Sequence, residues 1–503
     1  MRYFNSANGF FSMKEKTLKP SLKINAIFNA VTVISSLLFP LITFPYSSRV
    51  VMADGIGQVQ FFSSIINYIV LFTSLGIPMY AVREIARVRD NYNELKKTTI
   101  EIIILNLILT FIGYIIVSIL CYTVAKIKTD VPLFLLLSLT IILNTIGCPW
   151  FLKGVEDFKF ISIRTLCIQI VSVLWLFTFV HSKEDLLMYA SVSVIASAGN
   201  NVLCFIRMHK FIDFKNIFQL SLNPWRHLKP SLEIFVFNLI TSIYINLDSV
   251  MLGFLQDATS VGFYTAATKL SHMVLNVVTS IGTVLLPRLS NLIKNEDYTD
   301  FNKLVYKSYR IIWLLGMPMT VGIIIMAPIL IHLFSGSTYD PAIQTLRIIA
   351  PIIMAIGLSN LFGLQVLYPL DKIKLVTIST SAGACVNFSL NCLLIPLFAQ
   401  DGAAIATVVA ETCVTFVQIV IVKKYINFSL IDKTILSYIL ASTLMGVICY
   451  WVQSQNLTEV VLIIMVPVIG ALIYGSMLSL AKDSLFIEIG ADIIKPLTRM
   501  LKK

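Results

Sequence analysis

Residues 100–125 read IEIIILNLILTFIGYIIVSILCYTVA, and this stretch decides the class of fold. Its one charged residue is Glu101, and it exceeds the roughly 20 apolar residues with which a helix crosses a hydrocarbon layer of about 30 Å. The rest of the chain has the same character, because 57% of its 503 residues are hydrophobic and 13% are charged, against about 25% charged in ordinary globular domains. The composition predicts an integral membrane protein with little sequence left for a soluble domain.

Similar apolar stretches follow one another from end to end, and they predict an all-α protein with about fourteen transmembrane helices. These stretches are residues 24–44, 58–80, 100–125, 131–152, 161–180, 186–206, 232–255, 261–286, 311–334, 342–367, 375–398, 402–422, 434–453 and 460–480. The longest polar linker, with Pro224 and Pro230, divides the chain after the sixth stretch. The predicted parts are a tail (1–23), a six-helix N-lobe (24–206), a linker (207–230), a six-helix C-lobe (231–422), two trailing helices (423–480) and a second tail (481–503).

The charge pattern predicts how the chain lies in the membrane. The net charge is +12, from 39 Lys and Arg against 27 Asp and Glu, and in a membrane protein such an excess reflects topology rather than a nucleic-acid partner. If the N-terminus is cytoplasmic, 33 of the 39 basic residues fall in segments on the cytoplasmic side. We therefore expect both termini in the cytoplasm. The loops on the other side are short, which excludes a large extracytoplasmic enzyme domain.

No residue pattern points to catalysis, a metal or a cofactor. The five histidines form no HxxxH spacing, the eight cysteines form no metal-binding spacing, and no P-loop is present. The sequence therefore predicts a protein that is not an enzyme. Without a nucleotide site, transport would be driven by an ion gradient, by the membrane potential or by consumption of the product.

The two predicted halves carry corresponding corners, which suggests an internal repeat. Residues 48–52 end one helix and Gly57 opens the next, while residues 248–252 and Gly262 do the same in the second half. Repeats that rock about a central site are a common plan of transporters.

These segments also carry a family resemblance. The chain resembles the polysaccharide repeat-unit flippases of the Wzx or RfbX type, whose superfamily also contains the MATE multidrug exporters and the lipid II flippases. The stretches that carry the likeness, in order, are FPYSSRV (44–50) with GIG (55–57), LGIPMYAVREIAR (75–87), LDSVMLG (247–253) with VGFY (261–264), and GAAIAT (402–407). One departure is Val51-Met52, where the family leads us to expect Leu-Gly.

The resemblance implies a V-shaped, two-lobe bundle that alternates between inward-open and outward-open states. It implies transport of an oligosaccharide repeat unit linked to undecaprenyl diphosphate across the bacterial cytoplasmic membrane, for O-antigen, capsule or exopolysaccharide. Expected partners are this lipid-linked glycan, membrane lipids, and the polymerase and chain-length regulator of the same pathway. The alternatives are a lipid II-type flippase and a MATE-type drug or cation antiporter, which the two trailing helices disfavour.

Three ionisable residues lie deep in the predicted helices, where a charge costs about 2.5 to 3.5 kcal/mol at the bilayer centre. Glu411 lies about 14 Å into its helix at 1.5 Å per residue, and is a candidate for ion coupling or for a structural hydrogen bond. Asp248 and Lys269 lie at similar depths on adjacent antiparallel helices, so we expect them to face each other. They would form either a structural ion pair or a pair that opens when Lys269 binds the substrate diphosphate.

Four arginines complete the candidate site. Arg347 and Arg49 lie near the predicted outer mouth, where a guanidinium could bind the diphosphate or reach outer lipid headgroups. Arg83 and Arg87 lie at the inner side, where they would meet the charged headgroup during loading or simply form a solvated basic loop.

Overall fold

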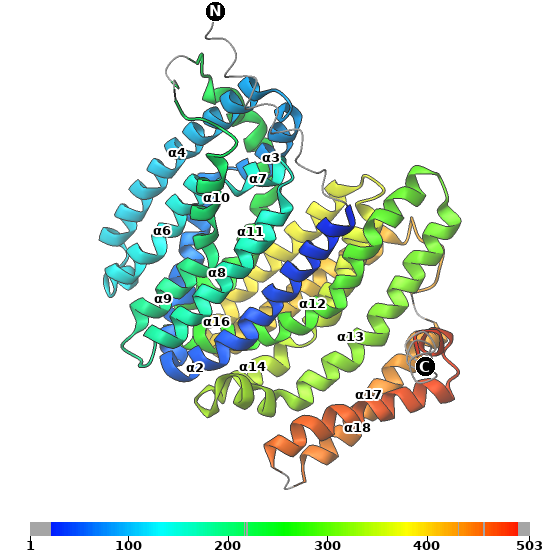
Figure 1. The fold of residues 1–503 in the computed structure, drawn as a ribbon. Helices are drawn as coiled ribbons and strands as arrows, with labels where there is room; N and C mark the ends of the chain where they lie inside the picture. The colour runs from blue at the N-terminus through cyan, green and yellow to red at the C-terminus, as the bar shows by residue number, and fades with distance from the viewer. Residues whose placement is uncertain (1–21, 216, 218–219, 431, 456–457, 491–503) are drawn as a thin grey trace, which may run out of the picture.

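The computed structural model describes residues 22–490 apart from residues 216, 218–219, 431 and 456–457. The predicted tail at 1–23 lies almost wholly outside this part of the chain, as does most of the tail predicted at 481–503. Within the described ranges the chain is helical apart from short connections (Figure 1).

The first half of the chain consists of helices joined by short turns, often capped by a polar side chain. Asn91, for example, accepts hydrogen bonds from the backbone N–H groups of Asn93 and Glu94 and so caps the next helix. The elements are α2 (Leu22–Ser74), α3 (Ile77–Val88), α4 (Tyr92–Thr123), α5 (Ala125–Lys128), α6 (Val131–Gly147), α7 (Pro149–Gly154), α8 (Phe158–Phe179), α9 (Leu186–Val194), the π-helix η1 (Ile195–Gly199) and α10 (Asn200–Met208).

The second half repeats this plan and adds two helices. Pro341 begins α14 as its first helical residue, a position that suits proline because its missing N–H group would have no partner there. The elements are the 3₁₀ turn η3 (Pro224–His227), α11 (Leu228–Leu255), α12 (Ala258–Lys294), α13 (Tyr298–Ser335), the 3₁₀ turn η4 (Ser337–Tyr339), α14 (Pro341–Ile349), α15 (Ile352–Asn360), the π-helix η5 (Leu361–Leu367), α16 (Ile373–Val422), α17 (Lys433–Gln453) and α18 (Glu459–Leu480).

Two of these helices each contain two predicted spans. α2 breaks at Met52 (φ 65°, ψ 176°) and α16 breaks at Ala399 (φ 47°, ψ −125°). Met52 stands where the resemblance leads us to expect glycine, and its backbone adopts the left-handed φ that glycine takes without strain. Eleven helices of the described residues are long and apolar enough to cross a membrane, and α11 adds a shorter apolar stretch, Ile245–Leu255. With the two breaks, the prediction of an all-α membrane protein of about fourteen spans is confirmed.

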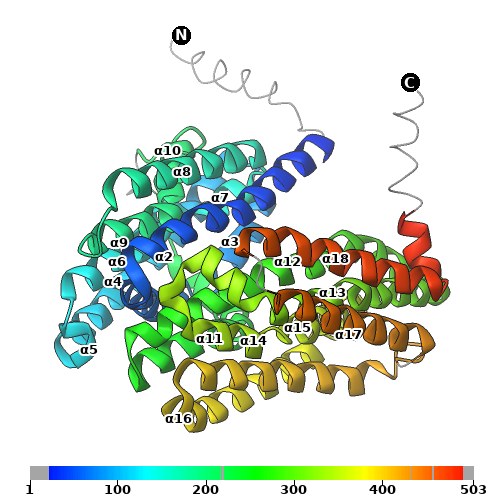
Figure 2. The ribbon, with the colours of Figure 1, turned by 90° about the horizontal axis from the view of Figure 1, so that it is seen from below.

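The helices form two bundles with a trailing pair. α2 packs against α4, α6 and α8 in the N-lobe, while α12, α13, α14 and α16 pack together in the C-lobe. α17 and α18 pack against each other and against α13 (Figures 1 and 2). α2 also packs along α12, α11 and α13, so it is the helix that joins the two lobes.

The lobes meet closely at one face, which we call the closed face and define by residues 44–58, 253–262 and 332–340. It lies at the lower edge of Figure 1. A Cβ atom on Gly57 would overlap the carbonyl oxygen of Ala258, and one on Gly262 would overlap the carbonyl oxygen of Ala53. The two corners that the sequence shows as corresponding are therefore in backbone contact, which only glycine allows.

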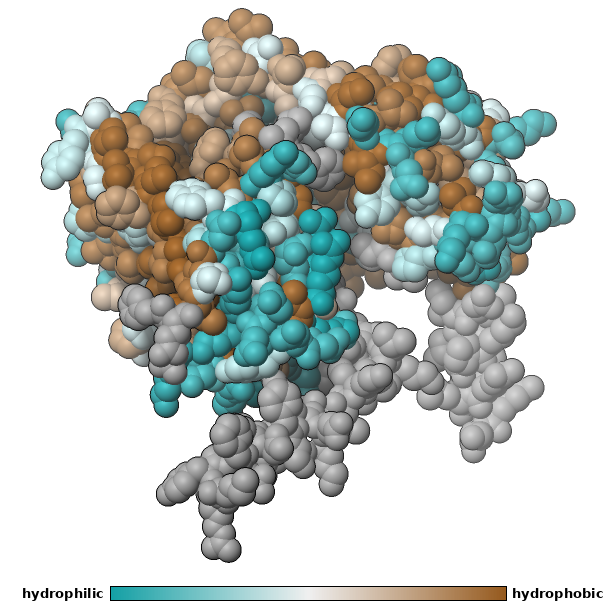
Figure 3. Space-filling model, turned by 90° about the horizontal axis from the view of Figure 1, so that it is seen from above, coloured by the Kyte–Doolittle hydropathy of each residue, from teal (hydrophilic) through white to brown (hydrophobic). Residues whose placement is uncertain are grey.

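At the opposite face a buried polar cluster ties the linker to the N-lobe. Glu101, with no exposed side-chain surface, contacts Arg226 at 2.6 Å and His227 at 3.0 Å. Burial lowers the pKa of His227, whose Nδ1 atom also lies 2.7 Å from the Tyr80 hydroxyl. The start of α11 is thereby fixed to the N-lobe, although the rest of that helix packs in the C-lobe. Hydrophilic side chains gather in two groups on this face (Figure 3).

Candidate functional site

The buried carboxylate of Asp248, on α11, is the centre of a hydrogen-bond network. It accepts from the Tyr264 hydroxyl at 2.5 Å and the Thr407 hydroxyl at 2.7 Å, and from the side-chain amides of Asn391 at 2.6 Å and Asn387 at 3.1 Å. α11, α12 and α16 supply these groups, so the network joins three helices of the C-lobe. Four donors offset the cost of burying a charge that is only 7% exposed.

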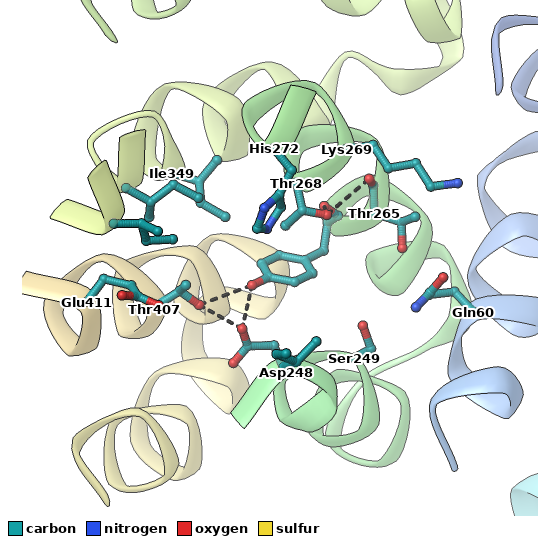
Figure 4. Close-up of a pocket in the computed structure, with 14 residues that line it drawn as sticks. Gln60, Asp248, Ser249, Thr265, Thr268, Lys269, His272, Ile349, Thr407 and Glu411 are labelled. Atoms are coloured by element: carbon teal, nitrogen blue, oxygen red, sulfur yellow. Dashed lines mark hydrogen bonds between the residues drawn. The ribbon is translucent and has the colours of Figure 1, made fainter. Parts of the chain in front are cut away.

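The expected ion pair between Asp248 and Lys269 is not formed. The donors of Asp248 occupy its two oxygens, and Lys269 points away from it toward α2 (Figure 4). The ammonium group of Lys269 lies 4.3 Å from the centre of the Phe44 ring, on the far side of α12. Both residues line one cavity, but a position along a helix does not fix the direction in which the side chain leaves it.

Lys269 lies where two polar cavities meet between the lobes. One cavity, of about 260 Å³, is lined by Asp248, Tyr264, His272, Thr407 and Glu411 from the C-lobe. The other, of about 190 Å³, is lined about equally by apolar side chains and by uncharged hydrogen-bonding side chains of the N-lobe. The hydrogen-bonding side chains are those of Gln60, Ser63, Asn67, Thr140, Tyr189, Ser193 and Ser197.

Both cavities include Gln60 and Lys269 in their walls. Lys269 is the only Lys or Arg among the described residues that line them. The site is therefore a central polar chamber with a single fixed cation, faced by hydroxyl and amide groups on one side and by two carboxylates on the other. Such a chamber can hold an anionic group together with sugar hydroxyls.

Glu411, the first candidate for ion coupling, lies in the wall of the C-lobe cavity on α16 and is 9% exposed. It is on the same helix as Thr407, one turn further along, so it borders the network of Asp248. The structure thus brings Asp248, Glu411 and Lys269 to one chamber. No described group of three or more His, Cys, Asp or Glu side chains could hold a metal ion.

Arg49 and Arg347 are placed outside this chamber. Arg49 is at the closed face, where its guanidinium donates to the carbonyl oxygens of His332 and Leu333 at the end of α13. Arg347 donates to the carbonyl oxygen of Ile324, also on α13. Neither side chain lines the two cavities in this conformation, so both serve contacts between helices.

Arg49 has a counterpart that the sequence analysis missed. Lys126, on α5 of the N-lobe, donates to the carbonyl oxygens of Gly253 and Gln256 at the end of α11. Two cations of the N-lobe thus bind the carboxyl ends of two C-lobe helices, where the helix dipole favours positive charge. The sequence of the short segment that carries Lys126 gave no signal of this role.

Arg83 and Arg87 are exposed on α3, at the face opposite the closed face. Both contact Glu84, at 3.5 and 3.0 Å. Such exposed pairs contribute little to stability.

A second, apolar feature lies along the trailing helices. A groove of about 600 Å³ runs between α13, α17 and α18. Its lining is almost entirely apolar and includes Pro318, Gly322, Met445, Val466 and Gly470. The fourteen-helix pattern predicts the trailing helices but contains nothing that predicts the groove.

Sequence reasoning also missed the partners of Asp248. A signal existed, because Asn387 and Asn391 are four residues apart in an apolar helix and so lie on one face. Nothing in the sequence, however, paired that face with Asp248.

Comparison with known proteins places the chain in a family. It is 26% identical over 411 residues to the protein of Escherichia coli (strain K12) named "Putative O-antigen transporter", covering 81% of this chain and 98% of that one. Among solved structures it is similar to a lipid II flippase MurJ in an inward closed conformation, with a TM-score of 0.68 at 15% identity over 92% of this chain and 99% of that chain. It is also similar to an inward-facing MATE multidrug transporter, with a TM-score of 0.63 at 13% identity over 80% of this chain and 97% of that chain.

These two structures share the fold of this chain, with its two helical lobes. The polysaccharide biosynthesis protein family matches residues 22–293, which is more than half of the chain and includes α2 to α12. This protein is a member of the polysaccharide biosynthesis protein family.

Proposed function

We propose that the protein is a flippase that moves undecaprenyl-diphosphate-linked oligosaccharide repeat units across the bacterial cytoplasmic membrane. The observation that carries this proposal is the polar chamber between the lobes, with Lys269 as its single fixed cation. A diphosphate needs positive charge in a low-dielectric site, and a neutral glycan needs hydroxyl and amide partners such as those on the N-lobe wall.

The apolar groove supports a lipid-linked substrate rather than a free sugar. A polyprenyl tail would lose its apolar surroundings if it entered a polar chamber. Lipid and apolar protein surface, by contrast, solvate it equally well. The groove along α13, α17 and α18 offers the tail an apolar path outside the chamber. An antiporter of small drugs or cations has no use for such a path, which favours a flippase over this alternative.

Alternating access would move the headgroup from one side to the other. At the closed face, Gly57, Gly262, Arg49 and Lys126 hold the lobes together, and an outward-open state has to break these contacts. The basic residues place the closed face outside if both termini are cytoplasmic. The polymerase and chain-length regulator of the pathway would then receive the unit at the outer face.

The function is tested by extracting lipids from cells with and without the protein. We expect undecaprenyl-diphosphate oligosaccharide to accumulate in the inner leaflet of cells that lack the protein, together with loss of surface polymer. The mass of the trapped lipid identifies the sugar. Accumulation of lipid II instead would favour a lipid II flippase, and unchanged lipid-linked glycans would favour an antiporter.

We also propose that Asp248, bordered by Glu411, binds the coupling proton or monovalent cation. In Asp248→Asn an amide N–H₂ group replaces one of the two acceptor oxygens and faces the donors that this oxygen served, so the network loses its charge and half of its acceptor atoms. We expect flipping in proteoliposomes to become slow and to lose its dependence on an imposed ion gradient. Asp401→Asn is the matched control, because Asp401 bonds Thr345 away from the chamber. Retained gradient dependence in Asp248→Asn would disprove the coupling role.

The groove gives a separate prediction. Gly322 lines the groove and has no heavy atom within 4 Å of the position that a Cβ atom would take, so the side chain of Gly322→Phe starts in open space and would fill part of the groove. We expect surface polysaccharide to fall severalfold while the amount of membrane-inserted protein stays normal. Gly322→Ala is the control and should behave as the parent. Normal polysaccharide in Gly322→Phe would show that the tail takes another path.

A further inference from the structure

His332, in the last turn of α13 at the closed face, contacts two carboxylates at once. Its Nε2 atom lies 2.7 Å from Asp340, at the start of α14, and its Nδ1 atom lies 2.8 Å from Glu459, at the start of α18. The side chain is 28% exposed, whereas Asp340 and Glu459 are 62% and 58% exposed. A single imidazole thus joins the ends of three helices and can still exchange protons with the medium.

This geometry fixes the protonation state of the ring. An ionised carboxylate only accepts hydrogen bonds, and a neutral imidazole has one N–H donor and one lone pair. A neutral ring would therefore turn a lone pair toward one of the two carboxylates. Both contacts are favourable only when both nitrogens carry hydrogen, which is the imidazolium form.

The surrounding charges favour the same form. Among the described residues, Asp340 faces the ring from the start of α14 and Glu459 from the start of α18, while the guanidinium of Arg49, on α2, donates to the backbone carbonyl oxygen of His332. Without a proton on His332, two carboxylates and one guanidinium leave this cluster with one net negative charge. The imidazolium brings the cluster to neutrality.

The same turn of α13 is contacted by side chains of α2 from the N-lobe. Arg49 donates to the carbonyl oxygen of His332 itself at 3.1 Å and to that of Leu333 at 2.7 Å. Ser48 donates to the carbonyl oxygen of Phe334 at 3.2 Å, and the rings of Phe44 and Phe334 stack with centroids 5.0 Å apart. The contacts that fix the position of this turn therefore also fix the surface against which α2 packs at the closed face.

We propose that His332 is a proton-binding site that braces the closed face. When protonated, it binds Asp340 of α14 and Glu459 of α18. It thereby fixes the last turn of α13, whose carbonyl oxygens accept hydrogen bonds from Arg49. Its stabilising effect is present in acid and is lost as rising pH removes the proton. Protons on this side of the membrane therefore favour closure, and their release favours opening, independently of which substrate is carried.

Spin labels at the closed face test this site. Met52 and Thr338 face each other across the lobes, with the Thr338 hydroxyl 4.0 Å from the Met52 sulfur. Labels on Met52→Cys and Thr338→Cys, in the full chain with the native cysteines replaced, report closure by pulsed EPR without substrate. We expect the short-distance fraction to fall severalfold between pH 5.5 and pH 8.5.

Two variants should remove this pH response. His332→Gln and Glu459→Gln should each give the low closed fraction at both pH values, and the exposed Glu459 provides a variant that leaves the helix core intact. His181→Gln is the matched control, since His181 is exposed on a loop of the same face, next to the contact between Lys183 and Asp54. It should respond to pH as the parent does.

An unchanged pH response in His332→Gln and Glu459→Gln would overturn the proposal. A parent whose distances do not depend on pH would overturn it as well. Either result would leave the proposed transport function untouched, because the measurement uses no lipid-linked glycan.

Discussion

Lys269→Glu is expected to abolish surface polysaccharide while the protein remains inserted in the membrane. A hydrogen bond to a charged group contributes about 1.5 to 3 kcal/mol, which is roughly a tenfold to hundredfold change in binding. Charge reversal adds repulsion of the diphosphate in a chamber that offers no other fixed Lys or Arg among its described lining residues. Surface polymer and inner-leaflet lipid-linked glycan should be measured in cells that depend on the variant.

Two variants show whether the loss of export comes from the charge at position 269 or from substitution and charge reversal in general. Lys269→Arg keeps a cation against Phe44 and should retain much of the export. Lys128→Glu makes the same charge change on an exposed residue of α5 and should leave export normal. Normal polysaccharide from Lys269→Glu would show that the diphosphate is bound elsewhere.

Gly57→Ala and Gly262→Ala should each hold the closed face apart. The added methyl group would overlap a backbone carbonyl oxygen of the other lobe, and backbone cannot move aside as a flexible side chain can. Overpacking of this kind costs about 1 to 3 kcal/mol or more, enough to shift the balance between closed and open states by about tenfold or more. Spin labels at positions 52 and 338 should show longer distances, and export should fall accordingly.

Gly199→Ala is the matched control for this prediction. It is also a helical glycine, but the nearest atoms to its added Cβ lie at 3.5 Å, an ordinary contact. It should leave distances and export as in the parent. Short distances together with normal export in Gly57→Ala would mean that the lobes separate along another surface.

Much of the fold was predictable because a membrane constrains it strongly. An apolar stretch of about 20 residues crosses lipid as a helix, because every backbone polar group must be hydrogen-bonded within the segment. The positions and order of these stretches therefore predicted the positions and order of the helices. The corners at Gly57 and Gly262 were recognisable as corresponding positions. The breaks at Met52 and Ala399 lie where the pattern separates two spans, although methionine and alanine seldom adopt a positive φ.

The site was less predictable than the fold. The sequence pointed to Asp248, Lys269 and Glu411 as deep ionisable residues, and the structure brings all three to one chamber. Their pairing was wrong, because a helix position gives depth while the direction of a side chain depends on rotation about the helix axis. The roles of Lys126 and Asn387, and the contact of His332 with Glu459, arise from partners more than a hundred residues away, which no local pattern specifies.

The sequence by itself determined the all-helical membrane fold, because the cost of exposing polar groups to lipid acts on each segment separately, and its motifs indicated the family. The tertiary structure decided which charges meet. It turned Asp248 toward four donors and Lys269 toward Phe44, and it placed Arg49 on the end of α13. These choices depend on how helices from distant parts of the chain rotate and pack, and that is settled only when all of them are in contact.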